Sequence, residues 1–190
     1  MRPMAILILM TLALLLSAAV SSTVAQQGNS SAPADTSMTF AVTSSAFAAG
    51  GEIPKQYTCK GADTSPPLGW SGAPANAAGF ALIVDDPDAP HGTWVHWVLW
   101  NLPLAAHALP EGMAKRDQLD DGSRQGRNSD RKIGYNGPCP PGGQTHRYFF
   151  RLYALDGKVD LASGATRADL DAAMKGHVLA QAEYMGTFHK

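Results

Sequence analysis

The chain has 190 residues, of which 15 are Lys or Arg and 16 are Asp or Glu, so its formal net charge is -1. Only 16% of the residues are charged and 45% are hydrophobic, which excludes an intrinsically disordered chain, since such chains combine high charge with few large apolar residues. The neutral balance also excludes a nucleic-acid binder, which needs a cationic footprint for the phosphate backbone. The length fits one domain, and 19 Gly with 13 Pro predict short strands and many loops.

The first 25 residues have the layout of a secretory signal peptide. Arg2 precedes an apolar run over residues 4–16, and small residues follow up to Ala25. The run is shorter than the roughly 20 residues of a membrane-spanning helix, which favours cleavage near Ala25 and leaves no stable membrane anchor. We therefore expect an exported protein, periplasmic or extracellular. Small and polar residues dominate positions 26–37, which predicts a disordered leader before a domain at residues 38–190.

Short apolar patterns predict the first strands. Residues 38–43 alternate weakly between apolar and polar side chains, and residues 50–76 are crowded with Gly, Pro, Ser and Asp, which indicates ordered loop. Residues 79–84 form a continuous apolar run that ends at the Asp-Asp-Pro-Asp turn of residues 85–88. An apolar run of this length before a turn is typical of a buried strand.

The next strand is predicted to be central in its sheet. Residues 93–100 (TWVHWVLW) are dense in β-branched and aromatic side chains, and a period of two places His96 on the face of Val98 and Trp100. Residues 103–145 follow and show no convincing period. A connection of this length inside a compact domain is usually functional or contains short elements.

A second histidine lies on the following strand. Residues 146–155 (HRYFFRLYAL) predict a strand with His146, Tyr148 and Phe150 on one face. A single histidine in a strand is more often a hydrogen-bonded core residue than a ligand. Two histidines on apolar strands, together with the carboxylate-rich turn at residues 85–88, are better explained as a binding site. Burying so many ionisable groups costs several kcal/mol unless they pair.

The only well-patterned helix is predicted near the C-terminus. Thr166 is a suitable N-cap, and Leu170, Met174 and Val178 form one apolar stripe, with Gly186 as a stop. Several strands, long loops and this C-terminal helix predict a mostly β fold, an antiparallel β-sandwich.

The chain contains two cysteines, Cys59 and Cys139. In an oxidising compartment an even pair predicts one disulfide, which would stabilise the fold by about 4 kcal/mol in the chain-entropy model because the closed loop is long. Two separate buried thiols, or one reactive thiol, are the alternatives, since the sequence does not show whether the two Cα atoms come within bridging distance.

Several motifs together resemble the phosphatidylethanolamine-binding protein family, in its bacterial Raf-kinase-inhibitor-like branch, over nearly all of residues 38–188. The stretches that carry the resemblance are Tyr57-Thr58-Cys59, Ser65-Pro66-Pro67-Leu68, DDPDAPHGTWVHWVLWNLP at residues 85–103, Leu109-Pro110-Glu111-Gly112, GYNGPCPPGGQTHRYFFRLYALD at residues 134–156, and GHVLA at residues 176–180. The Asp-Pro-Asp-x-Pro block and the Gly-Pro-Cys-Pro-Pro block with His-Arg-Tyr are specific in combination.

The resemblance implies a Greek-key sandwich of two antiparallel sheets and a non-catalytic protein without cofactor or metal. It also implies a pocket for a small anion or a phosphorylated headgroup, such as phosphate or phosphoethanolamine, and the modulation of a target protein such as a kinase or protease. By matching motif positions, the pocket comprises Asp86, Asp88, His96, Gly137, Pro138, Cys139, Pro140, His146 and Tyr148.

The expected roles follow from charge. Carboxylates repel phosphate, so the two aspartates are expected to orient the imidazoles and keep them charged rather than to face the ligand. His96 and His146 would then donate to the anion beside the Tyr148 hydroxyl. Backbone N–H groups of residues 137–139 are expected to form an anion-binding nest.

Two enzymatic alternatives use the same residues. The two histidines and two aspartates could hold a metal, although the sequence has no His-Glu-x-x-His or Cys-x-x-Cys spacing. Cys139 could also act as the nucleophile of a hydrolase, with His146 as its base. A disulfide to Cys59 would exclude the hydrolase.

Overall fold

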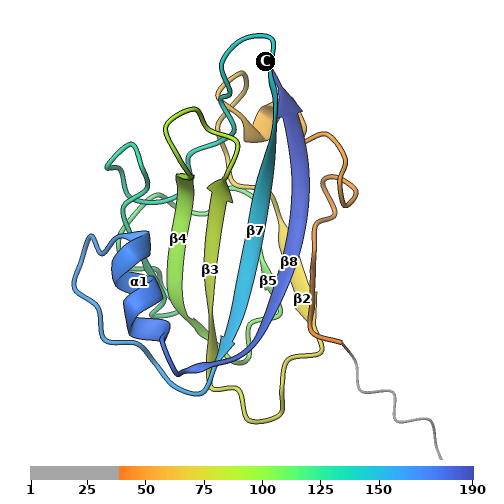
Figure 1. Cartoon of the computed structure of the whole chain (residues 1–190). Coiled ribbons are helices and arrows are strands. Elements are labelled where there is room, and N and C mark those ends of the chain that lie inside the picture. The colour runs from red at the N-terminus through yellow and green to blue at the C-terminus, as the bar shows by residue number, and fades with distance from the viewer. Residues whose placement is uncertain (1–38) are drawn as a thin grey trace, which may run out of the picture. The chain divides into compact units, whose positions relative to one another are not determined.

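The structure, a computed structural model, describes residues 39–190 and arranges their strands in two antiparallel sheets (Figure 1). The small sheet has the order β1-β2-β5, with β1 at Ala41–Thr43, β2 at Leu68–Ser71 and β5 at Ala108–Leu109. The large sheet has the order β6-β4-β3-β7-β8, with β3 at Gly79–Asp86, β4 at Trp94–Pro103, β6 at Arg124–Gln125, β7 at Thr145–Leu155 and β8 at Val178–His189. The helices are the 3-10 turn η1 at Lys55–Tyr57 and α1 at Arg167–Met174. The predicted mostly β sandwich is confirmed.

The signal peptide and the leader predicted for residues 1–37 lie outside the described residues. Within residues 39–190, no helix is long and apolar enough to span a membrane. The connection at residues 103–145 contains two short strands, β5 and β6, as its length suggested.

The main core lies between the two sheets. Trp70 of the small sheet meets Phe80 of the large sheet with ring centroids 5.5 Å apart. A second, outer core lies on the other face of β3 and β4, where Leu170 and Met174 of α1 are buried. Strand β3 is thus buried on both faces along its whole length, and this explains its unbroken apolar run.

The predicted helix is shorter than its apolar stripe suggested. Thr166 caps it, in a reciprocal capping box with Asp169, but α1 ends at Met174. Gly176, at φ 85°, turns the chain, and Val178 begins β8, which pairs with β7 along its length. The helix is therefore not the last element, and the assignment of Val178 to it is wrong.

Strand β8 carries a period of two that the helical stripe obscured. Ala182, Tyr184, Gly186 and Phe188 are its buried positions. Gly186 does not stop a helix but allows close packing, because a Cβ there would lie 2.6 Å from Phe47 and from Ile53. The predicted helix was too long because Leu170 and Met174 belong to a helix of only two turns. Val178 follows them at the same four-residue spacing by coincidence, although it belongs to β8.

A buried carboxylate attaches α1 to the large sheet. Asp85, at the end of β3, is 1% exposed and accepts hydrogen bonds from Arg151 of β7 and Arg167 of α1, the second at 2.8 Å. Arg167 also pairs with the more exposed Asp171. Removing the charge of Asp85 would leave two partly buried guanidinium groups without their common partner.

We expect Asp85→Asn to lower the free energy of unfolding by about 3 kcal/mol, measured by urea denaturation. The matched control is Asp171→Asn, which removes the more exposed partner of Arg167 and should cost less than about 1 kcal/mol. Equal losses in the two variants would contradict the central role of Asp85 in holding α1.

Candidate functional site

A pocket of about 460 Å³ opens where β3 ends and where β4 and β7 begin, at the upper end of these strands in Figure 1. Its lining residues are Asp86, Ala89, Pro90, His91, Trp94, His96, Asp130, Asn136, Cys139, Pro140, Pro141 and His146. Five of these belong to the site predicted from the sequence, namely Asp86, His96, Cys139, Pro140 and His146. Strand geometry thus brings the two histidines and one aspartate to the same pocket.

His96 reaches the pocket through a β-bulge in β4. The pairing of β4 with β3 skips from Val95 to Trp97 and leaves His96 as the extra residue. Val95 packs against the outer core, whereas the ring of His96 lies edge-on against Tyr148, with centroids 5.2 Å apart. The sequence prediction placed His96 on the outer-core face and was wrong, because a bulge breaks the two-residue period.

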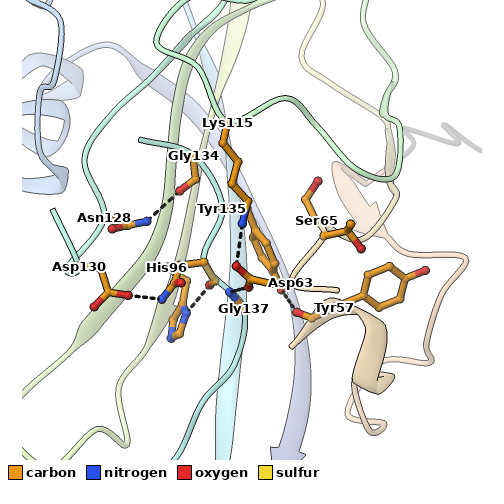
Figure 2. A network of polar contacts seen from close by, with 12 residues as sticks. Tyr57, Asp63, Ser65, His96, Lys115, Asn128, Asp130, Gly134, Tyr135 and Gly137 are labelled. Atoms are coloured by element: carbon orange, nitrogen blue, oxygen red, sulfur yellow. Dashed lines mark hydrogen bonds and ion pairs between the residues drawn. The ribbon is translucent and has the colours of Figure 1, made fainter. Parts of the chain in front are cut away.

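A backbone carbonyl fixes the tautomer of His96. Its Nδ1 lies 2.6 Å from the oxygen of Asn136, and since a carbonyl only accepts, Nδ1 carries the hydrogen. In Figure 2 this contact joins the ring to the loop that forms the pocket wall. The Nε2 atom is buried and has no hydrogen-bond partner within residues 39–190.

Burial decides the charge of His96. Desolvation lowers the pKa of His96 below its ordinary value and outweighs the Asn136 carbonyl and the carboxylates of Asp86 and Asp130, which raise it. The ring is therefore neutral at pH 7, and Nε2 presents a lone pair. The expectation that nearby aspartates keep this imidazole charged is wrong, because the ring is only 3% exposed.

His146 is oriented by Asp86, as expected. Its Nδ1 lies 2.7 Å from Asp86 Oδ2, and both side chains are buried. The other oxygen of Asp86 accepts the backbone N–H of Asp88 at 2.8 Å. The Nε2 atom of His146 lies 3.1 Å from Oε1 of Gln144, which is exposed and which an incoming ligand could replace.

Asp88 does not line the pocket. Its carboxylate forms a two-pronged pair with the guanidinium of Arg147, at 2.6 and 2.9 Å, and accepts the Arg147 backbone N–H at 3.0 Å. These hydrogen bonds hold the pKa of Asp88 at about 2. Asp88 therefore fixes the start of β7, next to His146, and leaves the imidazole to Asp86.

Tyr148 lies below the pocket rather than in its lining. Its ring supports His96, and its buried hydroxyl has no hydrogen-bond partner among the described residues. Burial, with the charges of Asp86 and Asp88, raises the pKa of Tyr148 far above its ordinary value. The hydroxyl therefore stays protonated and is a donor.

The Gly137 turn forms a wall and not a nest. The Gly137 N–H donates to Asp63 Oδ1 at 2.6 Å, and Lys115 Nζ binds the other oxygen of Asp63 at 2.7 Å (Figure 2). Pro138 has no N–H to offer, so residues 137 and 138 do not supply the N–H groups that the expected nest requires. A Cβ at Gly137 would lie 2.4 Å from the oxygen of Tyr57, which explains the glycine.

Three further contacts join this wall to η1 and to the loop after it. The Tyr135 hydroxyl donates to the oxygen of Tyr57 at 2.7 Å, and the Cys59 N–H donates to the oxygen of Pro138 at 3.1 Å. Cys59 and Cys139 form the predicted disulfide, with Cα atoms 5.4 Å apart. Cys139 therefore has no free thiol in this structure, and the cysteine hydrolase loses its nucleophile.

The sequence prediction missed part of the lining. Asp130 and Asn136 lie in the long connection, and Asn136 acts through its carbonyl, which any residue supplies. Asp130 accepts a hydrogen bond from the Asn136 side chain at 2.7 Å. In the part of the chain that the structure describes, no group of three or more His, Cys, Asp and Glu side chains is arranged to hold a metal ion.

Comparisons with known proteins place the chain in one family. A family model described as phosphatidylethanolamine-binding protein matches residues 43–189. A UPF0098 protein of Methanothermobacter thermautotrophicus is 50% identical over 145 residues, which cover 76% of this chain and 95% of the relative. A UPF0098 protein of Chlamydia muridarum is 44% identical over 154 residues, covering 78% and 98%.

Two solved structures share the fold. One, from Chlamydia trachomatis, is described as a homologue of phosphatidylethanolamine-binding protein; it is 43% identical, has a TM-score of 0.73, and the match covers 80% of this chain and 97% of that one. The other is YbcL of Escherichia coli, described as a member of the mammalian family, with 34% identity, a TM-score of 0.74, and 80% and 98% covered. With the family model matching most of the described residues, the chain belongs to the phosphatidylethanolamine-binding protein family.

Proposed function

We propose that the pocket binds a small anion, such as phosphate or a phosphoethanolamine headgroup, between His96 and His146. The observation that carries the proposal is the buried Nε2 of His96, which has no hydrogen-bond partner among residues 39–190 although its residue lines the pocket. A buried polar atom without a partner costs about 1–3 kcal/mol. A ligand that supplies the missing hydrogen bond recovers this cost.

The carboxylates of the pocket do not oppose an anion as strongly as their number suggests. Both oxygens of Asp86 are engaged, one by His146 and one by a backbone N–H. Asp130 accepts from the side chain of Asn136. The buried groups that can meet a ligand are the Nε2 atoms of His96 and His146, and an anion near His96 favours its protonated, donating form.

The size and the remaining lining suit a phosphate ester. A volume of about 460 Å³ lies within the range of about 300–1,000 Å³ that is typical of small-molecule sites. Pro90, Trp94 and Pro140 add apolar surface beside the histidines, which fits the carbon chain of a headgroup. The two solved relatives are described as a homologue and a member of the phosphatidylethanolamine-binding protein family, and this supports the same ligand class here.

The proposal includes export and binding without catalysis. The signal-peptide pattern of residues 1–25 predicts export, and a disulfide between exposed cysteines suits an oxidising compartment. The cysteine hydrolase is disfavoured because Cys139 is bonded to Cys59. The modulation of a kinase or protease stays a prediction of the family resemblance.

The first prediction concerns pH. In the free protein the pKa of His96 lies below its ordinary value of about 6.5, and a bound anion raises it, so binding takes up a proton. We expect anion affinity to increase as pH falls from 8 towards 5. Isothermal titration with sulfate, whose charge is constant in this range, measures the effect without the protonation of phosphate itself.

The pH prediction has an internal control. In His96→Asn the slope of affinity against pH should decrease, because the titrating group is gone. An equal slope in the wild type and the variant would show that His96 does not take up the proton. A flat profile in the wild type would contradict the linkage altogether.

The second prediction concerns the two imidazoles. Asn at position 96 keeps a donor for the Asn136 carbonyl but loses Nε2, and His146→Asn likewise removes the ligand-facing nitrogen. Each change should weaken phosphate binding about tenfold or more, since a hydrogen bond to a charged group contributes about 1.5–3 kcal/mol. The control is His107→Asn, which alters an exposed histidine outside the pocket lining. Unchanged dissociation constants in both pocket variants would overturn the proposed site.

A further inference from the structure

We propose that the Cys59–Cys139 disulfide is a thiol-exchange site in the pocket wall, which an external dithiol reduces, and that its reduction weakens anion binding. The exchange reaction stands on the geometry of the two cysteines alone. Its effect on binding rests on the proposed function.

The disulfide is accessible and adjoins the pocket. Cys59 and Cys139 are both exposed, in contrast to the buried His96 and His146, so a thiolate can reach the bond from solvent. Cys139 itself belongs to the pocket lining, beside Pro140. Exposed disulfides are the labile class, whereas purely structural ones resist reduction.

The wall can lose this bond without losing its attachment. Three hydrogen bonds still join it to η1 and the loop after it: Gly137 N–H to Asp63, Cys59 N–H to the oxygen of Pro138, and the Tyr135 hydroxyl to the oxygen of Tyr57. The first of them lies next to Asn136, whose carbonyl holds His96. Reduction therefore loosens only the short segment from Cys139 to Pro141, since the Gly143 N–H donates to the oxygen of Lys190, and it leaves the His96 contact in place.

A neighbouring cation determines which of the two sulfur atoms is attacked. Lys190 Nζ lies 3.7 Å from Cys139 Sγ, where an ammonium stabilises a departing thiolate. The attacking thiolate should therefore bond to Cys59 Sγ, while the sulfur–sulfur bond breaks and its electron pair leaves with Cys139. The second thiol of the dithiol then attacks the mixed disulfide and releases Cys59, so the dithiol is oxidised to a disulfide and the protein gains two thiols.

Loss of the bond should weaken binding through loss of preorganisation. Cys139 and Pro140 form one side of the pocket. Within residues 39–190, the Cys59–Cys139 disulfide is the only covalent cross-link that holds this side. When this side is held only at Pro138 and Gly143, an anion must order the residues between them on binding, and this cost lowers the affinity. The Asp86–His146 pair lies on another wall and is unaffected.

The proposed exchange site can be tested without any anion, by identifying which cysteine forms the mixed disulfide. Wild-type protein is treated with glutathione, quenched with acid and analysed by peptide mass spectrometry. We expect the mixed disulfide mainly on Cys59, and we expect Lys190→Gln to slow exchange several-fold and to reduce this preference. The control Lys158→Gln, an exposed lysine outside this contact, should behave as the wild type. A mixed disulfide mainly on Cys139, or exchange unaffected by Lys190→Gln, would overturn the assignment.

Phosphate titration then tests the effect on binding. We expect the protein reduced with dithiothreitol to bind phosphate several-fold more weakly than the oxidised protein, with circular dichroism showing that both are folded. The Cys59→Ser/Cys139→Ser double variant should match the reduced protein, with or without dithiothreitol. Equal affinities of the oxidised and reduced forms would overturn the coupling. If the oxidised protein binds no phosphate, the proposed function fails, and the glutathione experiment still decides the exchange site.

Discussion

The site depends on a pair of hydrogen bonds between the bulge of β4 and the pocket wall. Nδ1 of His96 donates to the oxygen of Asn136, and the N–H of Asn136 donates to the oxygen of His96. The first bond sets the tautomer, so the other ring nitrogen, Nε2, carries no hydrogen and is left without a partner in the described residues. The second aligns the wall with the strand, and Asp63 continues this support by binding the next N–H, that of Gly137. The pocket is thus built from backbone contacts around one buried imidazole.

Three aspartates at the end of β3 and in the turn after it, Asp85, Asp86 and Asp88, have separate functions because their side chains point in different directions. Asp85 faces the outer core and holds Arg151 and Arg167. Asp86 faces the pocket and holds His146, and Asp88 turns back to pair with Arg147. None of the three is left with an unpaired charge, so the carboxylates are compatible with the anion site that we propose. It also explains why charge alone did not reveal how His96 ionises.

The sequence was informative where one face or both faces of an element were buried. The apolar run of β3 and the aromatic pattern of β7 predicted strands correctly, since their side chains pack against the core. The face of His96 could not be predicted because a bulge depends on the partner strand. Strand β8 was missed because two turns of α1 and the first residue of β8 together imitate a longer helix.

The candidate site was predictable only in its side chains. Asp86 and His146 were found because a carboxylate and an imidazole on neighbouring strands are unusual in an apolar setting, and the family motifs pointed to the same positions. Asn136 was missed because it acts through its carbonyl, and Asp63 because it lies in a loop far from the pocket motifs. A backbone contact leaves no trace in residue type.

The two sides of the pocket are held by different chemistry. On one side, Asp86 fixes His146 by an electrostatic hydrogen bond between buried groups. On the other, the wall that ends in Cys139 is fixed by a covalent bond at the surface. The net charge of -1 provides no long-range attraction for an anion, so the anion affinity that we propose must come from how well these two sides are preorganised. Under that proposal, protonation of His96 changes the charge of the pocket, and reduction of the Cys59–Cys139 bond changes its preorganisation. The two changes act on different groups of the same pocket.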